Sequence, residues 1–454
     1  MQKLALEATQ ENISSTFQED ILKRNIDIAY FFALLNSFDD ACTVALNGPW
    51  GSGKTFFVKQ VKIILDYYNA YMIHAETVPE SMEKKIKEVI SSIKLDERDI
   101  IPQVSVYYDA WENDNDDDPM MSLLYAIIQS TDNEYSFKNR NYTKIALAAI
   151  EMVTGKKISA FFDAIKGGTP FEKIVEQKKL AVLIDEFLDE LLIEHGNRLV
   201  VFVDELDRCK PYFAVSLLER IKHYFDHKNI TFVFSVNLNQ LQHTIKKHYG
   251  SDFDAFGYLN RFFDLMIMLP SIDIVEYYGT LTKYADNLEN MVVKVLIEQF
   301  QFNLRQIAKY IYLLRKINHN RYNNIMNRNA YEFCTCVVVP IAVALSIYSI
   351  KEYEEFVLGN NADRFLQVLK NEKIKIVDSF LNGDETYDNT PGKQHISVDE
   401  RLQSIYRALF LNKGDFLQQD YFGILEITSP IRKDLKITLS GLSCHMDFSR
   451  SLPE

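Results

Sequence analysis

The sequence predicts an α/β fold, a three-layer sandwich with a mostly parallel five-stranded sheet, followed by a helical domain. Five short runs rich in β-branched and aromatic residues alternate with stretches of helical period over the first 272 residues. This alternation is typical of a parallel sheet covered by helices on both faces. A glycine-rich loop separates the first strand from the next helix, and residues 273–381 show helical patterns only.

Each predicted element follows from a local pattern. Residues 17–40 have the apolar spacing of a helix that leads into the first strand. Helical patterns fill residues 112–196, between the second and third strands, so we expect a helical insertion there. The strands are expected at residues 42–47, 103–110, 198–204, 230–237 and 264–270.

The chain of 454 residues is too long for one compact core, so two or three domains are expected. Residues 1–272 would form the sheet domain with its N-terminal helix and the insertion. Residues 273–381 would form the helical domain, and residues 382–454 a C-terminal region. That region starts with a stretch rich in turn formers and polar groups, residues 382–398, which predicts a loop.

Residues 47–56, NGPWGSGKTF, match the phosphate-binding pattern of two glycines separated by four residues, then Lys and Thr. Glycines let backbone N–H groups converge on an anion, and the following helix adds its partial positive charge. Lys54 is expected to reach the β- and γ-phosphates and Thr55 to place a hydroxyl on Mg²⁺. The alternative is a turn that matches by chance, but the strand before it and the helix after it favour the phosphate loop. The residues expected to contact the nucleotide are Gly48, Pro49, Trp50, Gly51, Ser52, Gly53, Lys54, Thr55 and Phe56.

Two adjacent carboxylates end the third predicted strand. Asp204 is expected at the Mg²⁺, through water, because this ion keeps much of its hydration shell. Glu205 would then orient or deprotonate the attacking water. The alternative is an acidic strand end that faces solvent.

Three further polar residues are candidates for a hydrolytic site. Asn237 ends the fourth strand, where a polar side chain would lie near the γ-phosphate; the alternative is an ordinary strand-end Asn. A cation supplied by a neighbour or a lid stabilises charge on a leaving phosphate. Arg261 would serve a neighbouring subunit, and Arg305 would act from the helical domain. For each arginine the alternative is a structural salt bridge.

Together these residues resemble the KAP family of P-loop NTPases, which covers bacterial phage-exclusion proteins and animal membrane-associated scaffolds. Trp50 inside the phosphate loop and the run Asp207-Arg208-Cys209-x-Pro211 are more specific than the phosphate-loop pattern. The resemblance covers roughly residues 17–350. The matching segments are LNGPWGSGKT from Leu46, YDAWEND from Tyr108, VDELDRCKP from Val203, FSVNLNQL from Phe234, YLNRFFDL from Tyr258 and NLR from Asn303.

The resemblance implies a nucleotide-driven switch built from an NTPase core and a helical lid, with ATP and Mg²⁺ as cofactors. Two departures matter. Family members often carry transmembrane helices between the second and third strands, and this chain does not. The acid after Asp204 is often Asp, whereas Glu205 stands here and is also a competent base. Spacing alone assigns no role to Asp207 and Arg208, while Trp111 is expected to pack near the site.

The formal net charge of −13 disfavours unspecific nucleic-acid binding by the whole surface. Residues 303–330 nevertheless contain six basic and no acidic residues. This stretch faces either nucleic acid or phosphate, or else the acidic sheet domain, which we favour. Residues 333–350 are nearly long enough to span a bilayer, but their polar residues favour a buried core helix and no integral membrane segment. Five irregularly spaced cysteines favour a reducing cytoplasm.

Three functions compete at this point. The first is an ATPase whose cycle drives a conformational or oligomeric switch, with a role in bacterial anti-phage defence. The second is a scaffold that holds ATP and recruits a partner with little hydrolysis. The third is a nucleic-acid-dependent motor, which the acidic charge disfavours. Glu205 favours the first over the second, because a holder needs no base. We expect a homo-oligomer and a partner protein encoded nearby.

Overall fold

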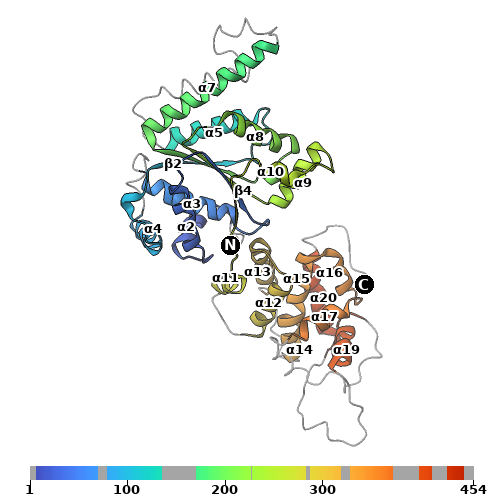
Figure 1. The fold of residues 1–454 in the computed structure, drawn as a ribbon. Coiled ribbons are helices and arrows are strands. Elements are labelled where there is room, and N and C mark those ends of the chain that lie inside the picture. Colours follow the sequence, from blue (N-terminus) through green and yellow to red (C-terminus); the bar gives the residue numbers. More distant parts are fainter. Residues whose placement is uncertain are drawn as a thin grey trace, which may run out of the picture. The chain divides into compact units, whose positions relative to one another are not determined.

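The computed structural model describes residues 7–69, 79–134, 170–225, 227–282, 287–318, 328–371, 398–411 and 427–443. The chain divides into two compact units (Figure 1). The first is Ala8–Ile272, and the second contains the described residues from Asp273 onward. The first unit carries the sheet and the phosphate loop.

The first unit is built on a five-stranded sheet in the order β2-β3-β4-β1-β5. Every neighbouring pair of strands is parallel, which confirms the predicted fold class and strand positions. Because β1 lies between β4 and β5, the loop that follows β1 emerges at the carboxyl edge between two neighbouring strands, one strand in from the end of the sheet. The strands are β1 (Cys42–Asn47), β2 (Gln103–Asp109), β3 (Arg198–Asp204), β4 (Ile230–Val236) and β5 (Leu265–Met268).

Side chains that alternate along the strands enter two separate cores. Val200 and Phe202 of β3 point into one core, and Val201 and Val203 into the other. Both sets are fully buried, as expected for a sheet covered on both faces. The continuous run LVVFV in β3 therefore reflects two buried faces rather than one.

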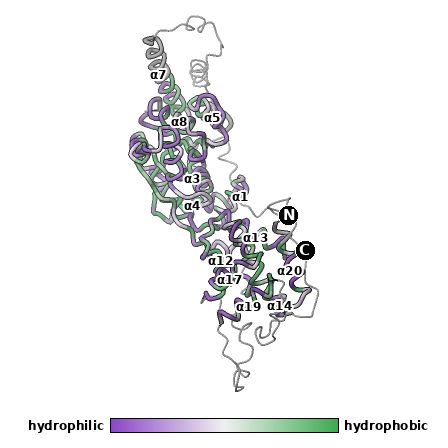
Figure 2. The backbone as a smooth tube through the Cα atoms, turned by 90° about the vertical axis from the view of Figure 1, so that its right-hand side faces the viewer, coloured by the Kyte–Doolittle hydropathy of each residue, from purple (hydrophilic) through white to green (hydrophobic). Residues whose placement is uncertain are grey.

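Two groups of helices cover the sheet (Figure 1). Hydrophobic and hydrophilic residues alternate along α3 (Lys54–Tyr68), α4 (Glu80–Ser92) and α8 (Pro211–Tyr224), as expected for helices with one buried face (Figure 2). One face carries α1 (Gln10–Gln18), α2 (Asn25–Asn36), α3 (Lys54–Tyr68) and α4 (Glu80–Ser92). The other carries α5 (Pro119–Glu134), α7 (Pro170–His195), α8 (Pro211–Tyr224), α9 (Leu238–Tyr249) and α10 (Ala255–Leu259).

The single helix predicted over residues 17–40 is wrong, because two helices occupy this region. Asp20 and Lys23 adopt left-handed backbone angles, with φ of 49° and 53°, which end the helical path. Asn25 stabilises the turn by donating its side-chain amide to the Phe17 carbonyl at 2.8 Å. Apolar spacing continues through the turn because both helices pack on α3, so periodicity alone did not reveal the break.

The predicted insertion between β2 and β3 contains α5 and α7. Buried residues of both helices join the core that also holds β3 and α8. Residues 135–169 of the insertion lie outside the described residues.

The second unit contains only helical elements in the segments that the structure describes, in agreement with the predicted fold class. Its predicted C-terminal loop, residues 382–398, lies almost entirely outside those segments. α20 packs on the helices before it, since the Tyr353 hydroxyl donates to the Leu439 carbonyl at 3.1 Å. The helices are α11 (Ile274–Thr282), α12 (Leu288–Gln299), α13 (Leu304–Asn318), α14 (Arg328–Phe333), α15 (Val339–Tyr348), α16 (Ile350–Val357), α17 (Ala362–Leu369), α19 (Val398–Phe410) and α20 (Ser429–Ser443).

One continuous helical stretch in the described segments, Asn329–Tyr348, is long and apolar enough to cross a membrane by length and composition. It joins α14 and α15 through a π-helical turn, Cys334–Val338. Within its most apolar window, 72% of the residues are buried inside the protein. Tyr310 of α13 also donates its hydroxyl to the Pro340 carbonyl at 2.9 Å. These contacts are typical of a core helix.

Candidate nucleotide site

The loop between β1 and α3 has the backbone that a phosphate cradle requires. Gly51 and Gly53 adopt left-handed angles, with φ of 76° and 89°, where a side chain would introduce strain. At Gly48 an added Cβ would lie 2.9 Å from the Ser52 hydroxyl and 3.3 Å from the Leu269 Cβ, so there is little room for a side chain. Helix α3 begins at Lys54, so its free N–H groups and partial positive charge lie at the loop.

Lys54 closes the loop on itself in this structure. Its Nζ donates to the carbonyls of Gly48 at 2.8 Å and Pro49 at 3.2 Å. Burial lowers the pKa of Lys54, and the charge of Asp207 partly opposes this effect. No carboxylate of the described residues forms an ion pair with this ammonium, and a buried ammonium in that position gains by meeting an anion. Lys54 is therefore placed to exchange loop carbonyls for phosphate oxygens.

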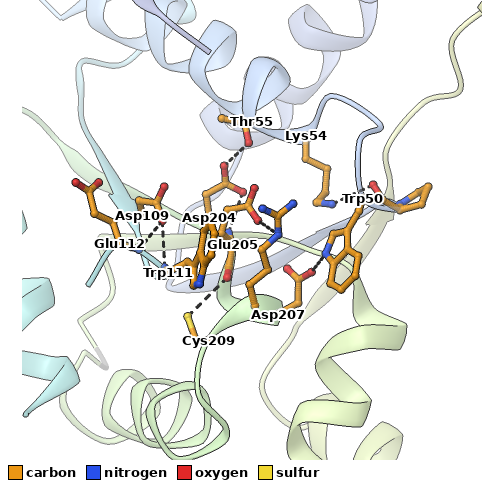
Figure 3. Close-up of polar contacts among 12 residues, drawn as sticks. Trp50, Lys54, Thr55, Asp109, Trp111, Glu112, Asp204, Glu205, Asp207 and Cys209 are labelled. Atoms are coloured by element: carbon orange, nitrogen blue, oxygen red, sulfur yellow. Dashed lines mark hydrogen bonds and ion pairs between the residues drawn. The ribbon is translucent and has the colours of Figure 1, made fainter. Parts of the chain in front are cut away.

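Thr55 and Asp204 meet although they come from different elements (Figure 3). The Thr55 hydroxyl donates to Asp204 Oδ2 at 2.6 Å, and the Tyr107 hydroxyl donates to the same oxygen at 3.0 Å. Asp204 is fully buried at the end of β3, and the Glu205 N–H donates to its other oxygen at 3.0 Å. A carboxylate held by three donors is fixed in direction beside the start of α3.

Glu205 follows Asp204 in a strained conformation. Its φ of 61° is left-handed, which is uncommon for a residue with a side chain and costs on the order of 1 kcal/mol. Its Oε2 lies 2.5 Å from Arg208 Nε. Burial raises the pKa of Glu205 to about 7, the charge of Asp204 adds to the rise, and Arg208 opposes it. A carboxylate with this pKa can accept a proton near neutral pH.

Two tryptophans and the short 3₁₀ turn Leu206–Arg208 lie beside Glu205 and the phosphate loop (Figure 3). The Trp50 indole N–H donates to Asp207 Oδ2 at 2.5 Å. The guanidinium carbon of Arg208 lies 5.6 Å from the ring centroid of Trp50 and 5.4 Å from that of Trp111. Burial raises the pKa of Asp207, against the effect of the Trp50 hydrogen bond. These contacts give Asp207 and Arg208 the structural positions that spacing alone could not assign, and Trp111 packs beside Arg208 as the sequence predicts.

Arg24, the residue just before α2, also binds the phosphate loop. Arg24 is 3% exposed, and its Nη1 donates to the Ser52 carbonyl at 2.9 Å. Its Nη2 donates to the Pro270 carbonyl, which follows β5. One guanidinium thus ties the loop to the segment that leaves the sheet.

The donor set fits a nucleotide with Mg²⁺. A threonine hydroxyl and a carboxylate are oxygen ligands, which Mg²⁺ prefers. Two hydroxyls near these ligands are buried without a hydrogen-bond partner. Ser52 lies in the phosphate loop, and Ser235 pairs with Asp204 across the sheet. A phosphate oxygen or an ordered water would satisfy hydroxyls in these positions.

A family model described as the KAP family P-loop domain matches residues 28–328, which include every strand and the phosphate loop. The chain belongs to the KAP family. No curated protein matches the chain. The KAP domain is therefore a nucleotide-binding P-loop NTPase domain, as its sequence motifs predicted.

Three further predicted site residues of the KAP domain, Asn237, Phe56 and Arg261, lie in three separate elements or loops. Asn237 caps α9 by accepting from the Gln240 N–H at 3.3 Å, and Asn47 caps the same helix by accepting from the Leu238 N–H at 3.0 Å. Phe56 is buried in the first turn of α3. Arg261 is exposed just before β5. None of these positions tests the proposed roles.

Arg305 lies on α13, in the second unit, and its side chain is exposed. Lys309, Tyr312 and Lys316 are exposed at helical spacing from it, so one side of α13 is basic with an aromatic residue in the middle. Residues 319–327 of the predicted basic stretch lie outside the described residues. The partner of this side of α13 remains a prediction.

Two residues that contact the candidate nucleotide site, Tyr107 and Arg24, were not identified from the sequence. Tyr107 sits two positions before the end of β2, next to β3, and its hydroxyl reaches Asp204 because adjacent parallel strands end together. That strand position is a signal that could have found it. Arg24 carries no such signal, since its contacts depend on the turn between α1 and α2.

Proposed function

We propose that this KAP domain binds ATP with Mg²⁺ and hydrolyses it. The observation that carries the proposal is the 2.6 Å contact between Thr55 and Asp204, because it joins the two predicted metal ligands beside Lys54. When bound, Mg²⁺ would neutralise phosphate charge and orient the oxygens. Thr55 and Asp204 would hold it, and Lys54 would bind the β- and γ-phosphates.

Glu205 is the proposed general base. It follows the proposed metal ligand directly, and burial raises the pKa of its carboxyl, which favours acceptance of a proton from water. Asn237 is proposed to hold a polar contact near the γ-phosphate. Arg261 of a neighbouring subunit and Arg305 of the helical unit are proposed to stabilise the charge that develops on the leaving group.

The wider role is proposed as a nucleotide-driven switch in the cytoplasm. The second unit would serve as the lid, and nucleotide would control the association of identical chains or of a partner protein encoded nearby. A role in anti-phage defence rests on the family resemblance alone.

The test is magnesium-dependent turnover by the purified chain, with ATP and GTP assayed in parallel. Glu205→Gln removes the base but keeps the size of the side chain, so nucleotide binding should persist while turnover falls by about 10²-fold or more. Lys54→Ala should lose binding. Equal turnover in Glu205→Gln would remove Glu205 from the mechanism.

A second candidate function is an ATP-holding scaffold with little hydrolysis. The 2.5 Å ion pair favours it, because a carboxylate bound to Arg208 is not free to accept a proton. Tight nucleotide binding with no turnover, in wild type and Glu205→Gln alike, would support this function.

A further inference from the structure

Arg208 occupies the centre of a cluster that connects the phosphate loop to Glu205. Its guanidinium lies over the rings of both Trp50 and Trp111 and pairs with Glu205 through Nε. The side chains of Arg208 and Glu205 are only 20% and 19% exposed, so water screens this ion pair less than a surface pair. Arg208 therefore holds a defined position rather than a solvated one.

The two tryptophans are not explained by burial. Trp50 and Trp111 are the only tryptophans in the chain, and they remain 42% and 53% exposed. A large aromatic residue is normally placed in a core, where it buries most of its area. Here each ring instead offers a face to the same guanidinium, which is the geometry of a cation–π contact.

Trp50 belongs to the phosphate loop itself, three residues before Gly53. Its indole N–H is held by Asp207, the residue next to Arg208. A continuous set of contacts thus runs from the loop through Trp50 to Arg208 and ends at the Glu205 carboxylate. In this arrangement Lys54 donates to two carbonyls of the phosphate loop, those of Gly48 and Pro49.

We propose that Arg208 is a positioning residue that holds Glu205 away from the reaction until the phosphate loop takes up a triphosphate. Phosphate oxygens draw Lys54 away from the carbonyls of Gly48 and Pro49, and the loop changes shape around them. Trp50 moves with the loop and loses its contacts with Asp207 and Arg208. Arg208 then releases the Glu205 carboxylate for the attacking water. This inference rests on the proposed hydrolysis by the same site.

Tryptophan emission reports the cluster directly, because both tryptophans lie in it. Trp111→Phe leaves Trp50 as the single reporter, and Trp50→Phe leaves Trp111. A slowly hydrolysed ATP analogue with Mg²⁺ should shift the emission of the Trp50 reporter, at concentrations where equilibrium dialysis shows binding. When Arg208→Gln is added to Trp111→Phe, the emission maximum without nucleotide should already differ from that of Trp111→Phe alone.

Steady-state kinetics give the second readout. Arg208→Gln should bind ATP within about threefold of wild type and turn over at the wild-type rate or faster, since Glu205 is no longer held. Arg364→Gln is the matched control. Arg364 pairs with Glu352 through Nε at 2.6 Å and through Nη2 at 3.1 Å, and its guanidinium lies over Phe300 and Tyr348, so it makes contacts of the same kind in the helical unit. Its loss should not change the emission shift caused by nucleotide.

The outcomes separate the two proposals. Nucleotide binding without any emission change in the Trp50 reporter overturns the role of Arg208 and leaves the proposed hydrolysis intact. A fall of about tenfold or more in kcat for Arg208→Gln, at unchanged nucleotide affinity, also overturns it, because Arg208 would then act on the reacting phosphates. Absence of nucleotide binding by the wild-type chain overturns both.

Discussion

At the scale of single residues, the phosphate loop is held in part by Arg24, a residue outside the loop. Arg24 donates to the carbonyls of Ser52 and Pro270 from a buried position. Arg24→Met keeps much of the side-chain volume but leaves both carbonyls without their charged donor. We expect the free energy of unfolding of the first unit to fall by about 3 kcal/mol. Urea denaturation followed by tryptophan emission measures this, since both tryptophans lie in that unit.

Arg98→Met is the control for this substitution. Arg98 is an exposed arginine of the same unit whose side chain pairs with Asp96 on the surface. Because solvent screens that pair, its loss should leave the denaturation curve unchanged within error. An equal response in both variants would show that the contacts of Arg24 do not stabilise the loop.

At the scale of elements, the buried histidine between α7 and β3 should make stability depend on pH. His195 ends α7 with 1% exposure, and burial lowers its pKa to about 4 from an ordinary value of 6.5. Between these values the unfolded chain binds the proton and the folded chain does not, so stability falls as the pH falls below 6.5. From pH 7 to pH 5 the loss from this group should be about 2 kcal/mol.

Replacement by a residue that does not titrate tests this dependence. His195→Asn should lower the free energy of unfolding at pH 7, because the new side chain packs less well. Between pH 7 and pH 5, however, the variant should lose less of this free energy than wild type does. His243→Asn, at an exposed position of α9, should keep the wild-type slope. A slope in His195→Asn equal to that of wild type would exclude His195 as its source.

The elements also show why some of the structure could be predicted and some could not. The strands are local, since runs such as residues 198–204 encode burial on both faces in consecutive residues. The phosphate loop and its following helix are equally local. The contacts of Arg24 and Tyr107 are not, because they join residues 246 and 97 positions apart in sequence. Arg208 could be recognised as part of a motif, but its two aromatic partners became visible only in three dimensions.

At the scale of the whole molecule, the position of Arg261 bears on self-association. It is exposed before β5, so we expect it to act on the nucleotide of a neighbouring chain packed head to tail. Arg261→Ala should bind nucleotide normally but lose most turnover. Mixed with Lys54→Ala, which we expect not to bind nucleotide, it should regain part of the activity, because each chain supplies what the other lacks. No recovery between folded, exchanging subunits would mean that Arg261 acts within its own chain or only structurally.

The support given by Arg24 also affects where this domain can be cut. The family match begins at residue 28, whereas the compact unit begins at Ala8. A fragment trimmed to the match would discard Arg24 and the whole of α1, whose Ile13 carbonyl accepts a hydrogen bond from Gln60 of α3. Nucleotide affinity measured on such a fragment would be that of an unsupported loop. The physical boundary of the NTPase therefore lies upstream of the boundary that sequence similarity draws.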